Sequence, residues 1–71
     1  MIKVGSIVVP KKEFLDPGET QRPCVVVDIW NDKEVGEKMV VMDCEDVAKN
    51  KKDPSHPVYK FYTLSRYYEE I

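Results

Sequence analysis

The fold is decided by the stretch PCVVVDIWNDKEVGEKMVVMDC, residues 23–44. It holds two blocks rich in apolar and β-branched residues, 24–30 and 38–44, on either side of a polar segment that contains a glycine. Such blocks favour extended backbone, and a short polar segment between them is typical of a β-hairpin. We therefore predict two antiparallel strands joined by a turn over residues 31–37.

A turn centred near Glu34 would set the register of this hairpin. Because side chains alternate between the two faces of a strand, one face then gathers the apolar residues expected to form the core: Val25, Val27, Ile29, Met39 and Val41. The other face is mixed, which predicts either a bent hairpin with both faces partly covered or a surface that receives a partner. The same register pairs Val25 with Asp43, Val27 with Val41, Ile29 with Met39, Trp30 with Lys38 and Cys24 with Cys44.

Before the hairpin, residues 3–9 are rich in Val and Ile and predict a first strand that ends at a proline. Residues 10–22 follow as a loop, with a turn at Asp16–Glu19 because proline and glycine occupy its centre. Phe14 and Leu15 lie in this loop, and we expect them to fold back over one end of the core.

After the hairpin, residues 45–57 predict one helical turn and then a loop containing two prolines. Residues 58–63, VYKFYT, predict a fourth strand. Residues 64–71 are compatible with a short 3₁₀ or α turn or with a last edge strand. The whole chain, 1–71, therefore reads as one all-β domain, a small SH3-like barrel of about five strands with a short helical turn near the C-terminus. A barrel closed by a C-terminal helix is the alternative.

The first half of the chain resembles the MazF/PemK toxin family, whose members open with a G-x-I-V strand, a flexible loop and an arginine-proline step into a Val-rich strand. The matching residues are Gly5, Ile7, Val8, Gly18, Glu19, Gln21, Arg22, Pro23, Val25, Val26 and Val27. The segment YTLSRYYEEI also faintly resembles the strand before that family's last helix. The resemblance implies the same kind of barrel, a fold that KOW-type modules share.

Members of that family cleave single-stranded RNA, and the resemblance implies that Arg22 would stabilise the phosphate in the transition state. Their second catalytic residue is a Thr or Ser after the central hairpin, where this chain has Met42-Asp43-Cys44-Glu45 and no hydroxyl. The chain is also shorter than the family's usual length. We therefore carry over the barrel and expect no catalytic residue and no cofactor.

Composition narrows the classes of partner. The net charge is −2, which disfavours a general nucleic-acid coat. No apolar run approaches the length of a membrane span, and the N-terminus resembles neither a signal nor a transit peptide, so we expect a cytoplasmic protein. Cys24 and Cys44 are expected to be reduced thiols on strands. With His56 they lack the spacing of a metal site, so no metal is predicted.

Eight residues are candidates for binding: Arg22, Trp30, Lys49, Lys51, Lys52, Tyr59, Tyr67 and Tyr68. The arginine could bind a phosphate, or simply pair with Glu19 or Asp16. The three lysines could grip a nucleic-acid backbone, or simply keep a loop solvated. The aromatic residues outnumber the inward positions of a small barrel, and exposed Trp and Tyr are typical of protein-recognition surfaces.

These features together predict a non-enzymatic binding module that acts on another protein. A small, acidic, stand-alone domain is also the type of accessory protein that phages and prophages encode. A homodimer is possible because an edge strand is expected to be exposed. The alternative is a reduced MazF/PemK-like protein that binds or cleaves RNA through Arg22 and the lysine loop.

Overall fold

The computed structural model describes all residues, 1–71. Five strands, one α-helix and two 3₁₀ turns follow one another along the chain. In order, these are β1 (Ile7–Pro10), η1 (Lys12–Phe14), β2 (Cys24–Asp32), β3 (Gly36–Asp43), α1 (Cys44–Lys52), β4 (Lys60–Leu64), η2 (Ser65–Tyr67) and β5 (Tyr68–Glu70).

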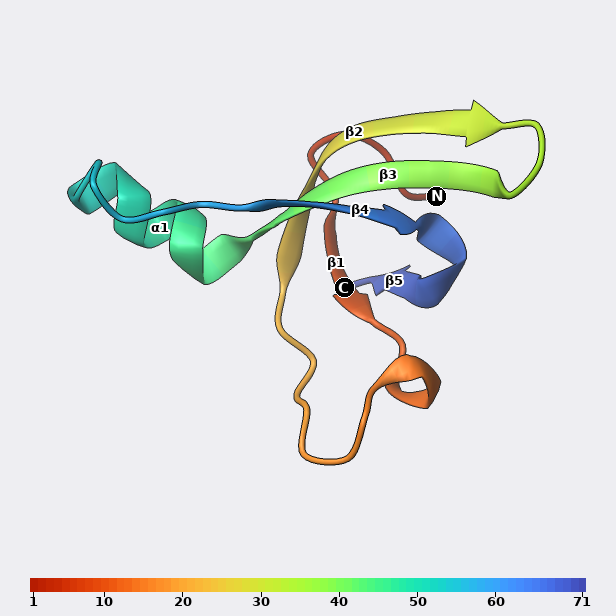
Figure 1. Cartoon of the computed structure of the whole chain (residues 1–71), viewed down its shortest axis with the longest axis horizontal. Coiled ribbons are helices and arrows are strands. Elements are labelled where there is room, and N and C mark those ends of the chain that lie inside the picture. Colours follow the sequence, from red (N-terminus) through yellow and green to blue (C-terminus); the bar gives the residue numbers. More distant parts are fainter.

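All five strands belong to one antiparallel sheet in the order β4-β3-β2-β1-β5, so β4 and β5 are its two edges. In a flat sheet, edges four spacings apart would lie roughly 19 Å from each other. Here the three residues of η2 connect β4 to β5, and a 3₁₀ segment of that length rises only about 6 Å. The sheet therefore curls strongly, as Figure 1 shows, but it stays open because no ladder joins its edges.

The β2–β3 hairpin is present as predicted, and Ile29 pairs with Met39 and Trp30 with Lys38. Its other half is shifted by one residue, because a β-bulge lies between Val26 and Asp28. The predicted pairings in this half were therefore wrong: Cys24 pairs with Asp43, Val25 with Met42 and Val26 with Val41. A bulge adds one residue to one strand and bends it, and Figure 1 shows the bend in β2.

The core lies on the concave face of the curled sheet and is small. Four fully buried side chains pack together there: Val8, Val26, Met39 and Val41. The bulge puts Val26 in the core in place of Val25 and Val27, which are only partly buried, so that part of the predicted core was wrong. Ile2, Cys24, Ile29 and Tyr68 pack around the cluster as partly buried side chains.

Helix α1 has nine residues where a single turn was predicted. Asp43 caps its start, two acidic residues occupy the first turn, and three lysines occupy the last turn. These charges complement the helix dipole, and the cap satisfies N–H groups that would otherwise lack partners. The prediction that both cysteines lie on strands was half right. Cys24 is the first residue of β2, but Cys44 is the first residue of α1.

The remaining segments agree with the sequence only in part. The predicted strand over residues 3–9 was too long, because β1 begins at Ile7 and the backbone N–H of Ser6 donates to the carbonyl of Lys3 at 2.9 Å in a turn before it. The predicted strand over residues 58–63 is present as β4, shifted to Lys60–Leu64.

The backbone N–H of Glu19 donates to the carbonyl of Asp16 at 3.0 Å, and Gly18 has a φ of +88°, so the predicted turn is present. Residues 64–71 contain both a 3₁₀ turn and an edge strand, the two conformations left open above. The structure is thus mostly β, and no helix is long and apolar enough to cross a membrane.

Candidate functional site

Strand β4 places aromatic side chains on both faces of the sheet. Phe61 pairs with Val41, and directly opposed residues in an antiparallel pair share a face, so Phe61 lies on the core face. Tyr62 pairs with Val40 and lies on the other face. Both side chains are solvent-exposed, Phe61 by 54% and Tyr62 by 76%. Phe61 is therefore a large apolar side chain that stays half exposed on the core face, beside core residues that are themselves fully buried.

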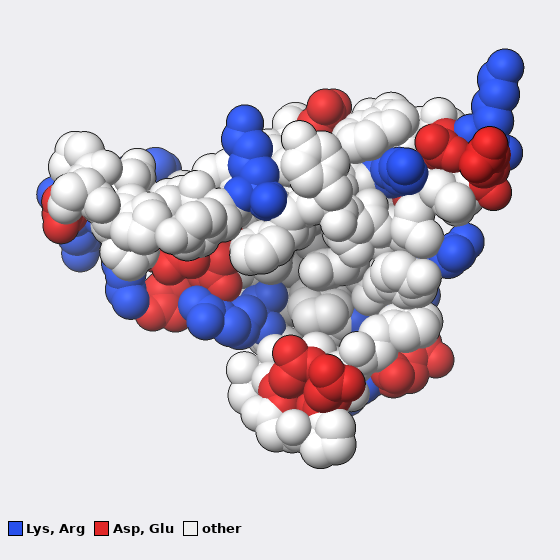
Figure 2. All heavy atoms as spheres, viewed as in Figure 1, with Lys and Arg blue, Asp and Glu red and all other residues white.

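A groove of about 360 Å³ opens beside Phe61, and we call it the concave groove. Val41 and Cys24 contribute to it from the central strands, and Phe61 and Tyr68 contribute from the two edge strands. The loop between β1 and β2 adds Leu15, Glu19, Thr20 and Arg22. Figure 2 shows a hollow here, with uncharged atoms inside it and charged side chains around its rim.

Arg22 lines the concave groove, but its guanidinium is held by carboxylates on the neighbouring elements. Its Nε lies 2.9 Å from Oδ2 of Asp43, and its Nη2 lies 3.5 Å from Oε2 of Glu45. The predicted pairing with Glu19 or Asp16 was wrong. The carboxylate of Glu19 instead accepts a hydrogen bond from the backbone N–H of Asp16 at 2.7 Å. Arg22 thus fastens the loop to the start of α1, and its charge is balanced locally.

The lysines do not form a single basic surface. Lys49 lies 3.0 Å from the carboxylate of Glu45, which also faces Arg22. Lys51 and Lys52 are exposed in the last turn of α1, where their charge complements the helix dipole. The structure brings Arg22 and Lys49 together but surrounds them with acidic side chains.

His56 attaches the segment after α1 to the helix. Its Nε2 lies 3.0 Å from Oδ1 of Asp46, which also lines the concave groove. The side-chain amide of Asn50 donates to the carbonyl oxygens of Pro54, at 3.3 Å, and His56, at 2.8 Å. These contacts fix the path of the chain from α1 into β4.

Neither cysteine is suited to nucleophilic chemistry. Burial raises the pKa of the Cys24 thiol from 9.0 to about 11, and the nearby negative charge of Asp43 adds to this. Burial also raises the pKa of the Cys44 thiol. Because the thiolate is the reactive form, both groups are held in their unreactive state near neutral pH. Both are free thiols, and no cluster of metal-ligating side chains is present.

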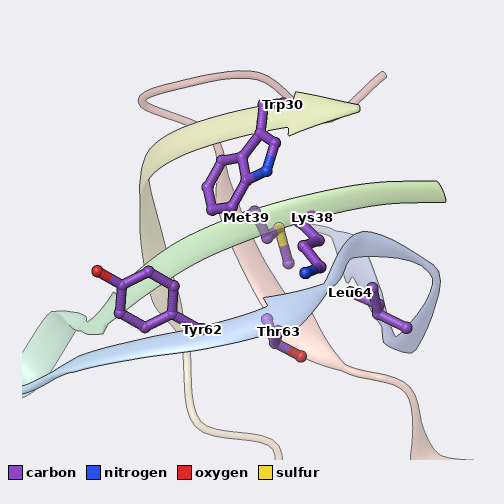
Figure 3. A pocket seen from close by; sticks show the side chains of 6 residues that line it. All are labelled: Trp30, Lys38, Met39, Tyr62, Thr63 and Leu64. Carbon is purple, nitrogen blue, oxygen red and sulfur yellow. The ribbon is translucent and has the colours of Figure 1, made fainter. Parts of the chain in front are cut away.

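A second aromatic feature lies on the opposite face, and we call it the Trp30 notch. Trp30 on β2 and Tyr62 on β4 flank β3, and Lys38 and Leu64 complete a hollow of about 250 Å³. Figure 3 shows the two rings on either side of β3. Lys38 is held 3.5 Å from the carboxylate of Asp32. The notch agrees with the expectation that Trp30 lies outside the core.

Of the other aromatic residues predicted to bind a partner, one is solvent-exposed and two pack against other side chains. Tyr59 is exposed, just before β4. Tyr68 packs against the core, and burial raises the pKa of its hydroxyl. Tyr67 stacks edge-on against Phe14, with ring centroids 4.8 Å apart, so Phe14 covers η2 while staying half exposed. Sequence reasoning omitted Phe61 and Tyr62 from the binding set, although their alternation on a strand at the edge of the predicted sheet could have identified them.

Comparisons with protein-family models, with curated proteins and with solved structures each found no match for this chain.

Proposed function

We propose that this protein is a small, non-enzymatic module that binds another protein by accepting an extended segment along the free edge of β4. The observation that carries the proposal is the exposure of Phe61 on the core face of an edge strand. An added strand would hydrogen-bond to the unpaired backbone of β4, which is a common way to recognise extended segments.

Side chains along that segment would meet two different surfaces. Alternate residues would point into the concave groove, toward Phe61 and Tyr68, and the others would lie beside Tyr62 and the Trp30 notch. Backbone pairing would supply general affinity, whereas the aromatic surfaces would supply selectivity. Exposed aromatic side chains of this kind are common anchors in protein interfaces.

We also propose that the sheet is an open SH3-like barrel. Three features support this: the five-strand order, the long loop after β1, and a 3₁₀ turn between the last two strands. Binding or cleavage of RNA is the less favoured function, because Arg22 is already paired with Asp43 and Glu45 and the chain's net charge is −2.

Selection from a random peptide library displayed on phage tests the proposal without a known partner. Selected peptides would be titrated into the protein, with the fluorescence of Trp30, the single tryptophan, as the signal. Phe61→Ser should weaken binding by roughly tenfold or more, since a buried aromatic anchor contributes at least about 1.4 kcal/mol.

The matched control is Val4→Ser, because Val4 is 58% exposed and lies outside the sheet. It should leave affinity unchanged. Failure to select any peptide at a protein concentration where the chain is monomeric, or peptides that bind Phe61→Ser as tightly as the native chain, would overturn the proposal. Single-stranded RNA is titrated in parallel. Salt-sensitive RNA binding that Arg22→Ala abolishes would favour the alternative.

A further inference from the structure

The chain exposes more surface than a folded protein of its size usually does. Its accessible surface is 5250 Å². A folded monomer of 8.3 kDa is expected to expose about 4,600 Å². The excess, roughly 650 Å², approaches the ~800 Å² that each partner contributes to a standard protein interface. Covering one further surface of that size would bring the molecule to the usual value.

The two edges of the sheet differ in how well they are protected. Strand β5 has three residues, including Glu69 and Glu70, and Glu70 also pairs with the N-terminal amine at 2.9 Å. Shortness and charge are the usual means of keeping an edge from pairing. Strand β4 has five residues, no proline, no bulge and a single charge, on Lys60. The unprotected edge is thus the one that carries the exposed aromatic residues.

We propose that the segment accepted by β4 is β4 of a second copy, so that the protein forms a two-fold symmetric dimer. This inference rests on the proposed function, since the second copy fills the same free edge and a segment of another protein would have to displace it. Tyr62 is the middle residue of the strand Lys60–Leu64. Antiparallel pairing about Tyr62 therefore engages all five residues of each copy and joins the two sheets into one of ten strands.

The residues of β4 suit pairing with themselves in this register. Lys60 faces Leu64 of the second copy, so the strand's single charge meets an apolar side chain and not its own equivalent. Phe61 faces Thr63, and the two Tyr62 rings meet at the axis. Aromatic cross-strand pairs stabilise a sheet, whereas like charges directly opposite destabilise it. The two Trp30 notches then lie on one continuous face, because Tyr62 shares that face with Trp30.

Sedimentation equilibrium from micromolar to millimolar concentration tests the dimer. The native chain should approach twice 8.3 kDa as concentration rises. Tyr62→Lys places two lysines opposite each other at the axis and should return the mass to that of one chain. Tyr59→Lys is the matched control, because Tyr59 is similarly exposed, at 63%, but precedes the strand. It should still dimerise. Circular dichroism confirms that both variants fold.

A cross-linking experiment tests the register. In a background with Cys24→Ser and Cys44→Ser, Tyr62→Cys should form an intermolecular disulfide on mild oxidation, because each introduced thiol faces its equivalent at the axis. Phe61→Cys should not, since its partner across the axis is Thr63 of the other copy. Efficient cross-linking of Phe61→Cys alone would show that the register is wrong.

The results separate this inference from the proposed function. A chain that stays monomeric at every concentration overturns the dimer, and so does a dimer that survives Tyr62→Lys. Masses that keep rising beyond two chains would indicate head-to-tail pairing of β4 with β5 and would also overturn it. In each case the binding of selected peptides, and its loss in Phe61→Ser, still decides whether β4 accepts a segment of another protein.

Discussion

Asp43 and Arg22 together fasten three parts of the chain. Oδ2 of Asp43 lies 2.9 Å from Nε of Arg22, on the loop that precedes β2. Oδ1 of the same carboxylate accepts hydrogen bonds from the backbone N–H groups of Glu45, at 2.9 Å, and Asp46, at 3.2 Å. One side chain at the end of β3 therefore both starts α1 and holds the loop that borders the concave groove.

Replacing Asp43 with Ala should lower the free energy of unfolding by about 1–2 kcal/mol, since both the helix cap and the ion pair are lost. Arg22→Ala should cost less than about 1 kcal/mol, because more than half of the Arg22 side chain is exposed and water screens the pair. Urea unfolding followed by far-ultraviolet circular dichroism measures both. Asp43→Asn keeps the cap oxygen and serves as control. Equal losses in Asp43→Ala and Arg22→Ala would contradict this division of roles.

The bulge in β2 gives a second prediction. Val26→Ala should lower the free energy of unfolding by roughly 1–3 kcal/mol, because Val26 is 1% exposed and its truncation leaves a cavity. Val27→Ala should cost clearly less, because the bulge leaves Val27 without a paired residue and only partly buried. The same unfolding measurement compares them. A larger loss from Val27→Ala would mean that the hairpin pairs without the bulge, as plain alternation predicts.

The bulge also shows what the sequence could and could not predict. The apolar blocks were enough to predict the hairpin and the half of its register near the turn, because period-2 alternation and turn position determine these. The run Val25-Val26-Val27 reads equally well in either register. The packing of Val8 and Met39 around Val26 selects one of the two registers. The local sequence pattern does not distinguish them.

The candidate site was predictable only in part for a similar reason. Trp30 and Tyr59 could be recognised as surplus aromatic residues, and both are exposed. The partners of Arg22 could not be predicted, because Asp43 and Glu45 are more than 20 residues away in sequence and meet it only after the sheet curls. The length of α1 was underestimated because the capping role of Asp43 was missed.

The Phe14–Tyr67 pair provides a third prediction. Its rings meet edge-on at 4.8 Å and link the first loop to the turn between the edge strands. A double-mutant cycle with Phe14→Ala and Tyr67→Ala should give a coupling free energy of about 0.5–1.5 kcal/mol, toward the lower end because Phe14 is half exposed. Additive losses in the double variant would show that the two rings act independently.

The Cys24 thiol gives a pH dependence with a definite sign. Its pKa is raised from 9.0 to about 11, chiefly by burial, so the folded chain keeps a proton that the unfolded chain loses between these values. Stability should therefore be intact below pH 9 and fall as the pH rises toward 11. Urea midpoints measured across this range should show a smaller fall in Cys24→Ala than in the native chain. Cys44→Ala is the control, because Cys44 is less buried, and its fall should stay closer to the native one. An unchanged pH dependence in Cys24→Ala would show that Cys24 titrates as an ordinary exposed thiol.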